Sequence, residues 1–327
     1  MFDSVEDVRK ALEAQKYICK ANIATVVYLA IKLQKPVLIE GPAGVGKTEL
    51  AKAVASALSL PLIRLQCYEG LDETKALYEW EYAKQLLYTQ MLRDKISEIL
   101  QGAHTLKDAA DRISAQDDLF FSERFIVPRP LMQAITAPSQ VMLLIDEVDK
   151  SDPEFEAFLL EVLSDFTVSI PELGTIHARQ IPLVFLTSNN AREMTDALKR
   201  RCLHLYIDFP EEATEIAILN ARVPGMDEKL VGDIVHLVQR IRTLDLKKTP
   251  SISETLDWAR ALLVLNADSL EQGVVEETLN IILKHQGDVH KAQGELGKLL
   301  AQKSAEVRSD PAAAPATPAA VKKSVLH

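Results

Sequence analysis

The sequence predicts an α/β fold in which a parallel sheet flanked by helices is followed by an all-helical domain. Over the first 210 residues, short apolar runs typical of buried strands alternate with segments of helical spacing, and strands separated by helices form parallel sheets. Beyond residue 210 only helical periods remain. We therefore expect an α/β core over 1–210, a helical lid domain over 211–305 and a disordered Ala/Pro-rich tail over 306–327.

Composition and charge set the broad class of the protein. Of the 327 residues, 47% are hydrophobic and 26% are charged, which is the balance of an ordinary globular protein. The three cysteines form no CxxC pair, which argues against a disulfide framework and suits a reducing cytosol, so we expect a cytoplasmic protein. No apolar run approaches the roughly 20 residues that span a bilayer. The net charge of −10 argues against a nucleic-acid partner.

The expected elements of the core follow one another in alternating order. Short apolar runs ending in glycine or polar residues predict strands within 35–41, 60–68, 140–150, 182–190 and 197–210. Helical spacing predicts helices over 48–58, most of 71–117 and 153–166. Residues 122–135 predict a short strand and a helical turn, and the alternation over 167–181 predicts a hairpin around Pro171 and Gly174.

The first strand-to-helix connection contains GPAGVGKT, residues 41–48, which fits the pattern G-x-x-x-x-G-K-[S/T]. Its glycines let the backbone turn tightly, so that N–H groups at the helix N-terminus point at phosphate oxygens. Lys47 would reach the β- and γ-phosphates of ATP, and the Thr48 hydroxyl would hold Mg²⁺. The predicted nucleotide-binding residues are Gly41, Pro42, Ala43, Gly44, Val45, Gly46, Lys47, Thr48 and Glu49.

Two acids follow the apolar run VMLLI. A carboxylate at a strand end is the usual partner of a phosphate-bound Mg²⁺, so Asp146 is the predicted magnesium residue together with Thr48. Glu147 is placed to polarise a water for in-line attack on the γ-phosphate. An enzyme that passes phosphate to a small substrate needs no base for water, so the Asp-Glu pair favours ATP hydrolysis over kinase chemistry.

Two further side chains are candidates for the reaction. The segment LTSNN ends the strand after that of Asp146, and Asn189 there could hold the attacking water or touch the γ-phosphate, although Asn is also common in turns. Arg200 and Arg201 stand at a predicted helix end. Basic residues there suit the helix dipole, but an arginine that completes a neighbouring subunit's site would also have to lie on such an exposed edge.

These motifs together resemble the AAA+ ATPases over about residues 5–300. Within that class the chain resembles the MoxR family, because a long segment separates the second strand from the LLIDEVD strand and a hairpin follows it. On this resemblance, residues 72–135 correspond to a helix-2 insert and 167–181 to a pre-sensor hairpin. The segments QCYEGLDETKALYEWEY, SERFIVPRP, RRCLHLYIDFP and PSISETLDWARAL resemble the subgroup encoded with carbon monoxide dehydrogenase-type molybdenum hydroxylases.

The resemblance assigns roles and partners. It implies that Asn189 is the sensor asparagine and that Arg201, or alternatively Arg200, is an arginine finger acting on the next subunit. It implies a homo-oligomeric ring, a hexamer, with ATP between subunits. It also implies a partner with a von Willebrand factor A domain, and a chaperone role in activating, or inserting metal into, a client metalloenzyme.

The chain departs from the family at one position in the predicted lid. Ser253 stands where the family often has an arginine, so either the lid senses the γ-phosphate weakly or Arg260 substitutes. Two other functions remain open. A DNA motor or transcription regulator would need basic pore loops or a DNA-binding domain, and a small P-loop kinase would work as a monomer with little ATPase activity.

Overall fold

The computed structural model describes residues 2–93, 101, 105, 107–108, 125–170 and 174–301. The chain divides into two compact units, Met1–Ala221 and Arg222–His327. This division falls after the expected position 210, because the segment that follows the last strand still belongs to the first unit. There Lys20 Nζ lies 2.5 Å from Glu211 Oε1, and Glu215 is fully buried. The expected tail over 306–327 lies outside the described residues.

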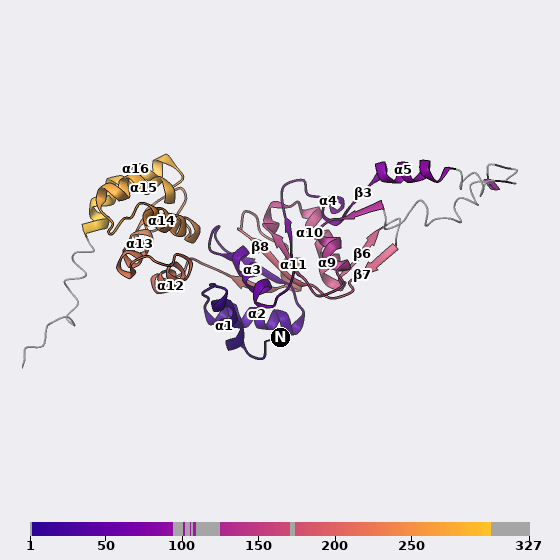
Figure 1. The fold of residues 1–327 in the computed structure, drawn as a ribbon, viewed down its shortest axis with the longest axis horizontal. Coiled ribbons are helices and arrows are strands. Elements are labelled where there is room, and N and C mark those ends of the chain that lie inside the picture. Colours follow the sequence, from indigo (N-terminus) through magenta and orange to yellow (C-terminus); the bar gives the residue numbers. More distant parts are fainter. Residues whose placement is uncertain are drawn as a thin grey trace, which may run out of the picture. The chain divides into compact units, whose positions relative to one another are not determined.

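The first unit contains a five-stranded sheet (Figure 1). All four neighbouring pairs in the order β2-β5-β8-β1-β9 are parallel. The strands are β1 (Val37–Glu40), β2 (Leu62–Gln66), β5 (Met142–Asp146), β8 (Leu183–Ser188) and β9 (Leu203–Tyr206). The predicted fold class, a parallel sheet flanked by helices with a helical region after it, is confirmed.

Helices pack on both faces of this sheet, and its central strands are therefore buried on both sides. Along β5 all five residues are buried, and successive side chains point to opposite faces. Leu143 and Ile145 join one apolar cluster with α9 and α10, and α3 packs against β5 and β8. The helices of this unit are α1 (Val5–Ala14), α2 (Ala21–Leu33), α3 (Lys47–Ala57), α4 (Glu73–Leu77), α5 (Tyr82–Met91), α9 (Pro130–Thr136), α10 (Pro153–Asp165), α11 (Asp196–Arg201) and α12 (Glu212–Arg222).

Two small antiparallel pairs lie outside the central sheet. β3 (Tyr78–Trp80) pairs with β4 (Ile126–Pro128), and β6 (Thr167–Ile170) pairs with β7 (Gly174–His177). The described part of 71–117 is mostly helical, as expected, but β3 interrupts it, and there Trp80 packs against Phe125. Much of the remainder of that segment lies outside the described residues.

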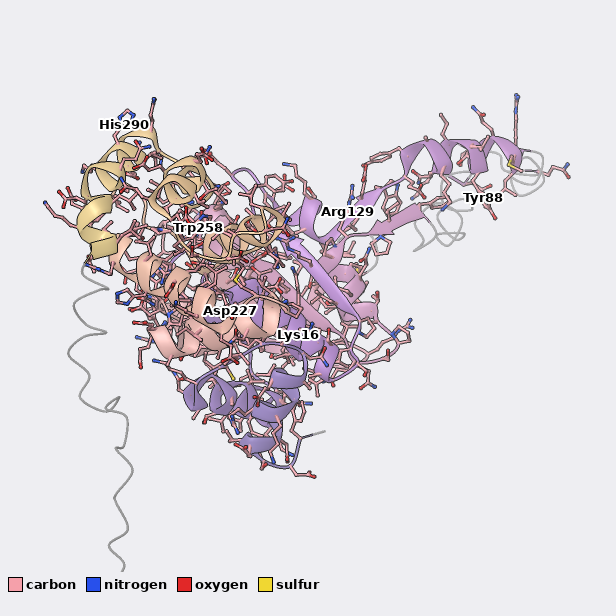
Figure 2. All side chains as sticks on the ribbon, turned by 60° about the vertical axis from the view of Figure 1, so that its left-hand side comes forward. Lys16, Tyr88, Arg129, Asp227, Trp258 and His290 are labelled. Atoms are coloured by element: carbon pink, nitrogen blue, oxygen red, sulfur yellow. The ribbon has the colours of Figure 1, made fainter. Side chains whose placement is uncertain are left out.

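The second unit consists of helices over its described part. They are α13 (Glu228–Ile241), α14 (Ile252–Val264), α15 (Gln272–Ile282) and α16 (Gln286–Ala301). The backbone N–H of Ser251 donates to Glu254 Oε2 at 2.8 Å, which caps the start of α14. Trp258 on the same helix, labelled in Figure 2, is fully buried and donates its Nε1 hydrogen to Thr278 Oγ1 at 2.8 Å. Trp258 is therefore a core residue of the second unit.

None of the helices in the described ranges is both long enough and apolar enough to cross a membrane.

Candidate active site

The glycine-rich turn between β1 and α3 has the backbone shape that its sequence predicts. Gly41, Gly44 and Gly46 all have positive φ angles, of 148°, 75° and 97°. At Gly41 a Cβ atom would lie only 1.9 Å from the carbonyl oxygen of Ile207, so this position admits no side chain. The turn ends with Gly46 as the N-cap of α3, which leaves the first N–H groups of the helix facing the turn.

Lys47 begins α3 and folds back over the turn. Its Nζ donates to Gly41 O at 2.7 Å, to Pro42 O at 2.6 Å and to Asn189 Oδ1 at 2.8 Å, and the residue is only 5% exposed. Burial lowers the pKa of Lys47 to about 8, and the carboxylates that follow β5 act in the opposite direction. A phosphate group in the turn would stabilise the charged ammonium further.

Asp146, the last residue of β5, is buried directly below the turn. Its Oδ1 accepts hydrogen bonds from Thr48 Oγ1 at 2.9 Å and from Thr187 Oγ1 at 2.5 Å. Its Oδ2 accepts from Arg64 Nη2 at 2.6 Å and Nε at 3.0 Å. The predicted pair of Thr48 and Asp146 therefore meets across the site, although residue 48 belongs to α3 and residue 146 to β5.

Glu147 occupies a left-handed backbone conformation, with φ of 57° and ψ of 49°. Such a conformation costs a residue other than glycine on the order of 1 kcal/mol. The Glu147 N–H donates to Thr187 Oγ1 at 2.9 Å. The Glu147 carboxylate accepts from Gln66 Nε2 at 2.8 Å, Asn189 Nδ2 at 3.2 Å and Lys150 Nζ at 2.6 Å. These contacts hold the carboxylate beside Asn189, at the edge of the sheet.

Asn189 connects the lysine to the glutamate. Its side chain accepts from Lys47 and donates to Glu147, while its backbone N–H donates to Asp149 Oδ2 at 3.1 Å. Asp149 Oδ2 also accepts from the N–H of Ala191 at 2.9 Å, so Asp149 anchors the loop that follows β8. Asn190 instead has a positive φ of 59° and donates its N–H to Ser188 Oγ at 3.1 Å, as expected of a turn residue.

The other candidate side chains form contacts on their own helix or on a neighbouring one. Glu49 pairs with Lys52 on its own helix at 2.7 Å. Arg201 is exposed, and its Nε donates to Ser164 Oγ of α10 at 2.5 Å. Arg200 is also exposed. Arg260 belongs to the second unit and pairs with Asp257 of its own helix at 3.1 Å.

The sequence interpretation missed four residues of the site: Arg64, Gln66, Thr187 and Asp149. Arg64 and Gln66 stand two residues apart near the end of β2, so they share one face of that strand. The sequence did contain a signal for these two residues: polar side chains at alternate positions near the carboxyl end of a predicted strand. Thr187 lies within LTSNN and Asp149 within LLIDEVD, segments that the sequence had already singled out.

Thr48, at the end of the glycine turn, and Asp146, at the end of β5, fit Mg²⁺ bound together with a nucleotide. Thr48 and Asp146 offer two oxygen atoms at one point beside the turn, which suits a cation that prefers oxygen ligands. Among the described residues, no group of three or more His, Cys, Asp or Glu side chains could form a metal site by itself.

A glycine turn on a helix N-terminus, with a lysine and strand-end carboxylates beside it, defines a P-loop ATPase domain. Residues 36–202, more than half of the 327, match the family described as AAA domain (dynein-related subfamily). The chain belongs to this family. All the site residues named above, from Gly41 to Arg201, lie within the matched range, whereas Arg260 lies beyond it.

Several known proteins are similar to the chain. The gas vesicle ATPase GvpN of Haloferax mediterranei is 28% identical over 217 residues, which cover 64% of this chain and 56% of that protein. The chain thus spans little more than half the length of that relative. An uncharacterized protein of Staphylococcus aureus (strain NCTC 8325) is 26% identical over 241 residues, or 71% of this chain and 77% of that protein. The solved RuvB Holliday junction branch migration motor of Thermotoga maritima is 16% identical, with a TM-score of 0.44 over 84% of this chain and 69% of that one.

Proposed function

We propose that the chain hydrolyses Mg-ATP at the edge of the sheet formed by β1, β5 and β8. One observation carries this proposal: Lys47, Glu147 and Asn189, which come from three separate segments, are joined by direct hydrogen bonds beside the glycine turn. Membership of the AAA domain family and the ATPase among the relatives support the same activity.

Each side chain has one task in this reaction. Lys47 binds the β- and γ-phosphates, and the N–H groups at the start of α3 bind phosphate oxygens. Mg²⁺, held through Thr48 and Asp146, would neutralise charge on the phosphates. Glu147 accepts the proton of the attacking water, and Asn189 orients that water because its amide already lies 3.2 Å from Glu147.

Replacing Lys47 by alanine tests the nucleotide site. We expect Lys47→Ala to weaken ADP binding about 100-fold, since charge-assisted hydrogen bonds to the phosphates contribute about 3 kcal/mol. Turnover of ATP should be lost. Lys52→Ala is the matched control, because Lys52 stands on the same helix and pairs with Glu49 on the surface. Unchanged ADP binding by a folded Lys47→Ala protein, judged by circular dichroism, would contradict the proposed site.

We further propose that the chain acts as a ring-forming remodelling ATPase of the MoxR type. In this role it works with a von Willebrand factor A domain protein on a client metalloenzyme, by activating it or assisting metal insertion. Support comes from the segments RRCLHLYIDFP and QCYEGLDETKALYEWEY, which carry the resemblance to ATPases encoded with molybdenum hydroxylases. The position of Arg201 supports the proposal of a ring. Its side chain is exposed and contacts Ser164 instead of joining the hydrogen bonds around Lys47.

A nucleotide-locked variant tests this wider role. Glu147→Gln should remain bound to ATP and therefore stay assembled with its partner. Pull-down of Glu147→Gln from the native cell, followed by mass spectrometry, should enrich a von Willebrand factor A domain protein relative to Lys47→Ala. Equal recovery with both variants would contradict an ATP-dependent partnership while leaving the ATPase proposal intact.

A further inference from the structure

Arg64 forms an ion pair with Asp146, the carboxylate that is proposed to hold Mg²⁺. Its guanidinium reaches Asp146 Oδ2 through Nη2 at 2.6 Å and Nε at 3.0 Å. The Asp146 side chain is only 3% exposed, whereas that of Arg64 is 49% exposed. The other carboxylate oxygen, Oδ1, is occupied by the hydroxyl groups of Thr48 and Thr187. Among the described residues, the cation that donates hydrogen bonds to Asp146 is therefore a side chain that reaches the site from solvent, whereas Lys47 interacts with Asp146 only through its charge.

A buried carboxylate is stabilised by a nearby positive charge in each state of the protein. Burying an unpaired ion is far more costly than burying a paired one, so Asp146 needs a cation whether or not nucleotide is bound. In the proposed ATPase that cation is Mg²⁺ when nucleotide is present. A guanidinium and Mg²⁺ at the same carboxylate group would repel each other. Because Arg64 is half exposed and flexible, its charged end can move into water when Mg²⁺ arrives.

We propose that Arg64 is the resident counter-ion of Asp146 and competes with Mg²⁺ for this carboxylate. This inference rests on the proposed Mg-nucleotide site and adds a residue that sets its magnesium requirement. Arg64 raises the Mg²⁺ concentration at which nucleotide becomes tightly bound. It forms its ion pair with Asp146 again when Mg²⁺ and ADP leave. It is a positioning residue, since it acts through Asp146.

The test measures binding of a fluorescent N-methylanthraniloyl ADP at a series of free Mg²⁺ concentrations, without any turnover. The midpoint of the magnesium dependence should fall about fivefold in Arg64→Gln, which is the scale expected for losing a half-exposed ion pair. Arg64→Lys keeps the charge but offers a single ammonium on a shorter chain, so its midpoint should lie between those of Arg64→Gln and the wild type.

Arg129→Gln is the matched control. Arg129, labelled in Figure 2, is 47% exposed on its side chain and forms an ion pair with Glu79, which belongs to β3 and not to the site. Its replacement should leave the magnesium midpoint unchanged. The control therefore separates competition at Asp146 from a general effect of removing one positive charge.

Each outcome has one meaning. A midpoint in Arg64→Gln that equals or exceeds that of the wild type overturns the proposal, since Arg64 would then be neutral toward Mg²⁺ or would support its binding. If Arg64→Gln does not fold, as judged by circular dichroism, the same criterion applies to Arg64→Lys. If the wild type itself binds the ADP analogue equally with and without Mg²⁺, the proposed magnesium site fails instead.

Discussion

At the scale of single residues, the site is organised by one amide that touches both ends of the proposed reaction. Asn189 lies between Lys47, which would bind phosphate, and Glu147, which would activate water. The left-handed conformation of Glu147 and the burial of Lys47 both carry a cost, and the hydrogen bonds around them offset it. Two predictions concern these individual side chains.

Glu147→Gln should keep ADP and ATP affinity but lose hydrolysis. The amide preserves the shape of the side chain but cannot accept a proton from water. Removal of a general base typically lowers the rate about 100- to 10,000-fold. Steady-state phosphate release and equilibrium nucleotide binding, measured on the same preparation, separate the two effects. A loss of only a few-fold would mean that another group is the base, and Asp149 would be tested next.

Asn189→Ala should lower turnover about 100-fold, the usual effect of removing one preorganised hydrogen-bond donor from a reacting centre. Nucleotide binding should change little, because Lys47 keeps its contacts with Gly41 and Pro42. Asn190→Gly serves as the control, since glycine accepts the positive φ of that position. Equal losses in the two variants would mean that the loop as a whole, and not the Asn189 amide, matters for turnover.

At the scale of elements, a buried carboxylate joins α10 to the loop before α11. Glu156 is fully buried and accepts from the N–H of Thr195 at 2.7 Å and from Arg192 Nη1 at 2.7 Å. Burial acts to raise the pKa of Glu156, but the hydrogen bonds from Thr195 and Arg192 outweigh it and lower the pKa below the ordinary 4.5. This contact fixes the segment that leads from Asn189 toward Arg201.

Glu156→Gln should therefore destabilise the first unit by about 3 kcal/mol, because it removes one partner of a buried ion pair. Glu154→Gln, at an exposed position of the same helix, is the control and should have almost no effect. Because the folded-state pKa is lowered, the stabilisation is present above pH 4.5 and is lost as the pH falls below it. Urea unfolding at pH 7 should show the full difference, and the difference should shrink below pH 4.5. A difference independent of pH would contradict the charged state of Glu156.

At the scale of the whole molecule, replacing Arg201 tests whether the chain works alone or in an assembly. If Arg201 acts on ATP bound to a neighbouring subunit, Arg201→Ala should bind ATP normally and hydrolyse it 1,000- to 100,000-fold more slowly, roughly the contribution of such arginines. Arg200→Ala in parallel distinguishes the two arginines. Light scattering in the presence of ATP reports the size of the assembly.

A mixing experiment tests the direction of this effect. Arg201→Ala subunits have an intact glycine turn, and Lys47→Ala subunits have an intact arginine. Each variant alone should be inactive. Mixed assemblies should regain turnover at interfaces where an intact glycine turn of one subunit meets an intact Arg201 of the next. If mixed rings form and remain inactive, Arg201 acts within its own chain or supports only the helix end, where basic residues suit the dipole of α11.

The sequence by itself determined the fold class and the chemical type of the site. GPAGVGKT forms a tight turn because its glycines accept positive φ angles, and the apolar run before Asp146 forms a buried strand. These features are local, so residue spacing carries them. Periodicity did not reveal the short strand Tyr78–Trp80, which lies within a segment expected to be mostly helical.

Only the tertiary structure decided which distant side chains meet. β8 lies between β5 and β1, which brings Asn189 to Lys47, and the pairing of β2 with β5 brings Arg64 onto Asp146. Local spacing does not encode the order of strands in a sheet, because each parallel strand can pair with several others. The observed order creates the contact of Arg64 with Asp146 and that of Asn189 with Lys47.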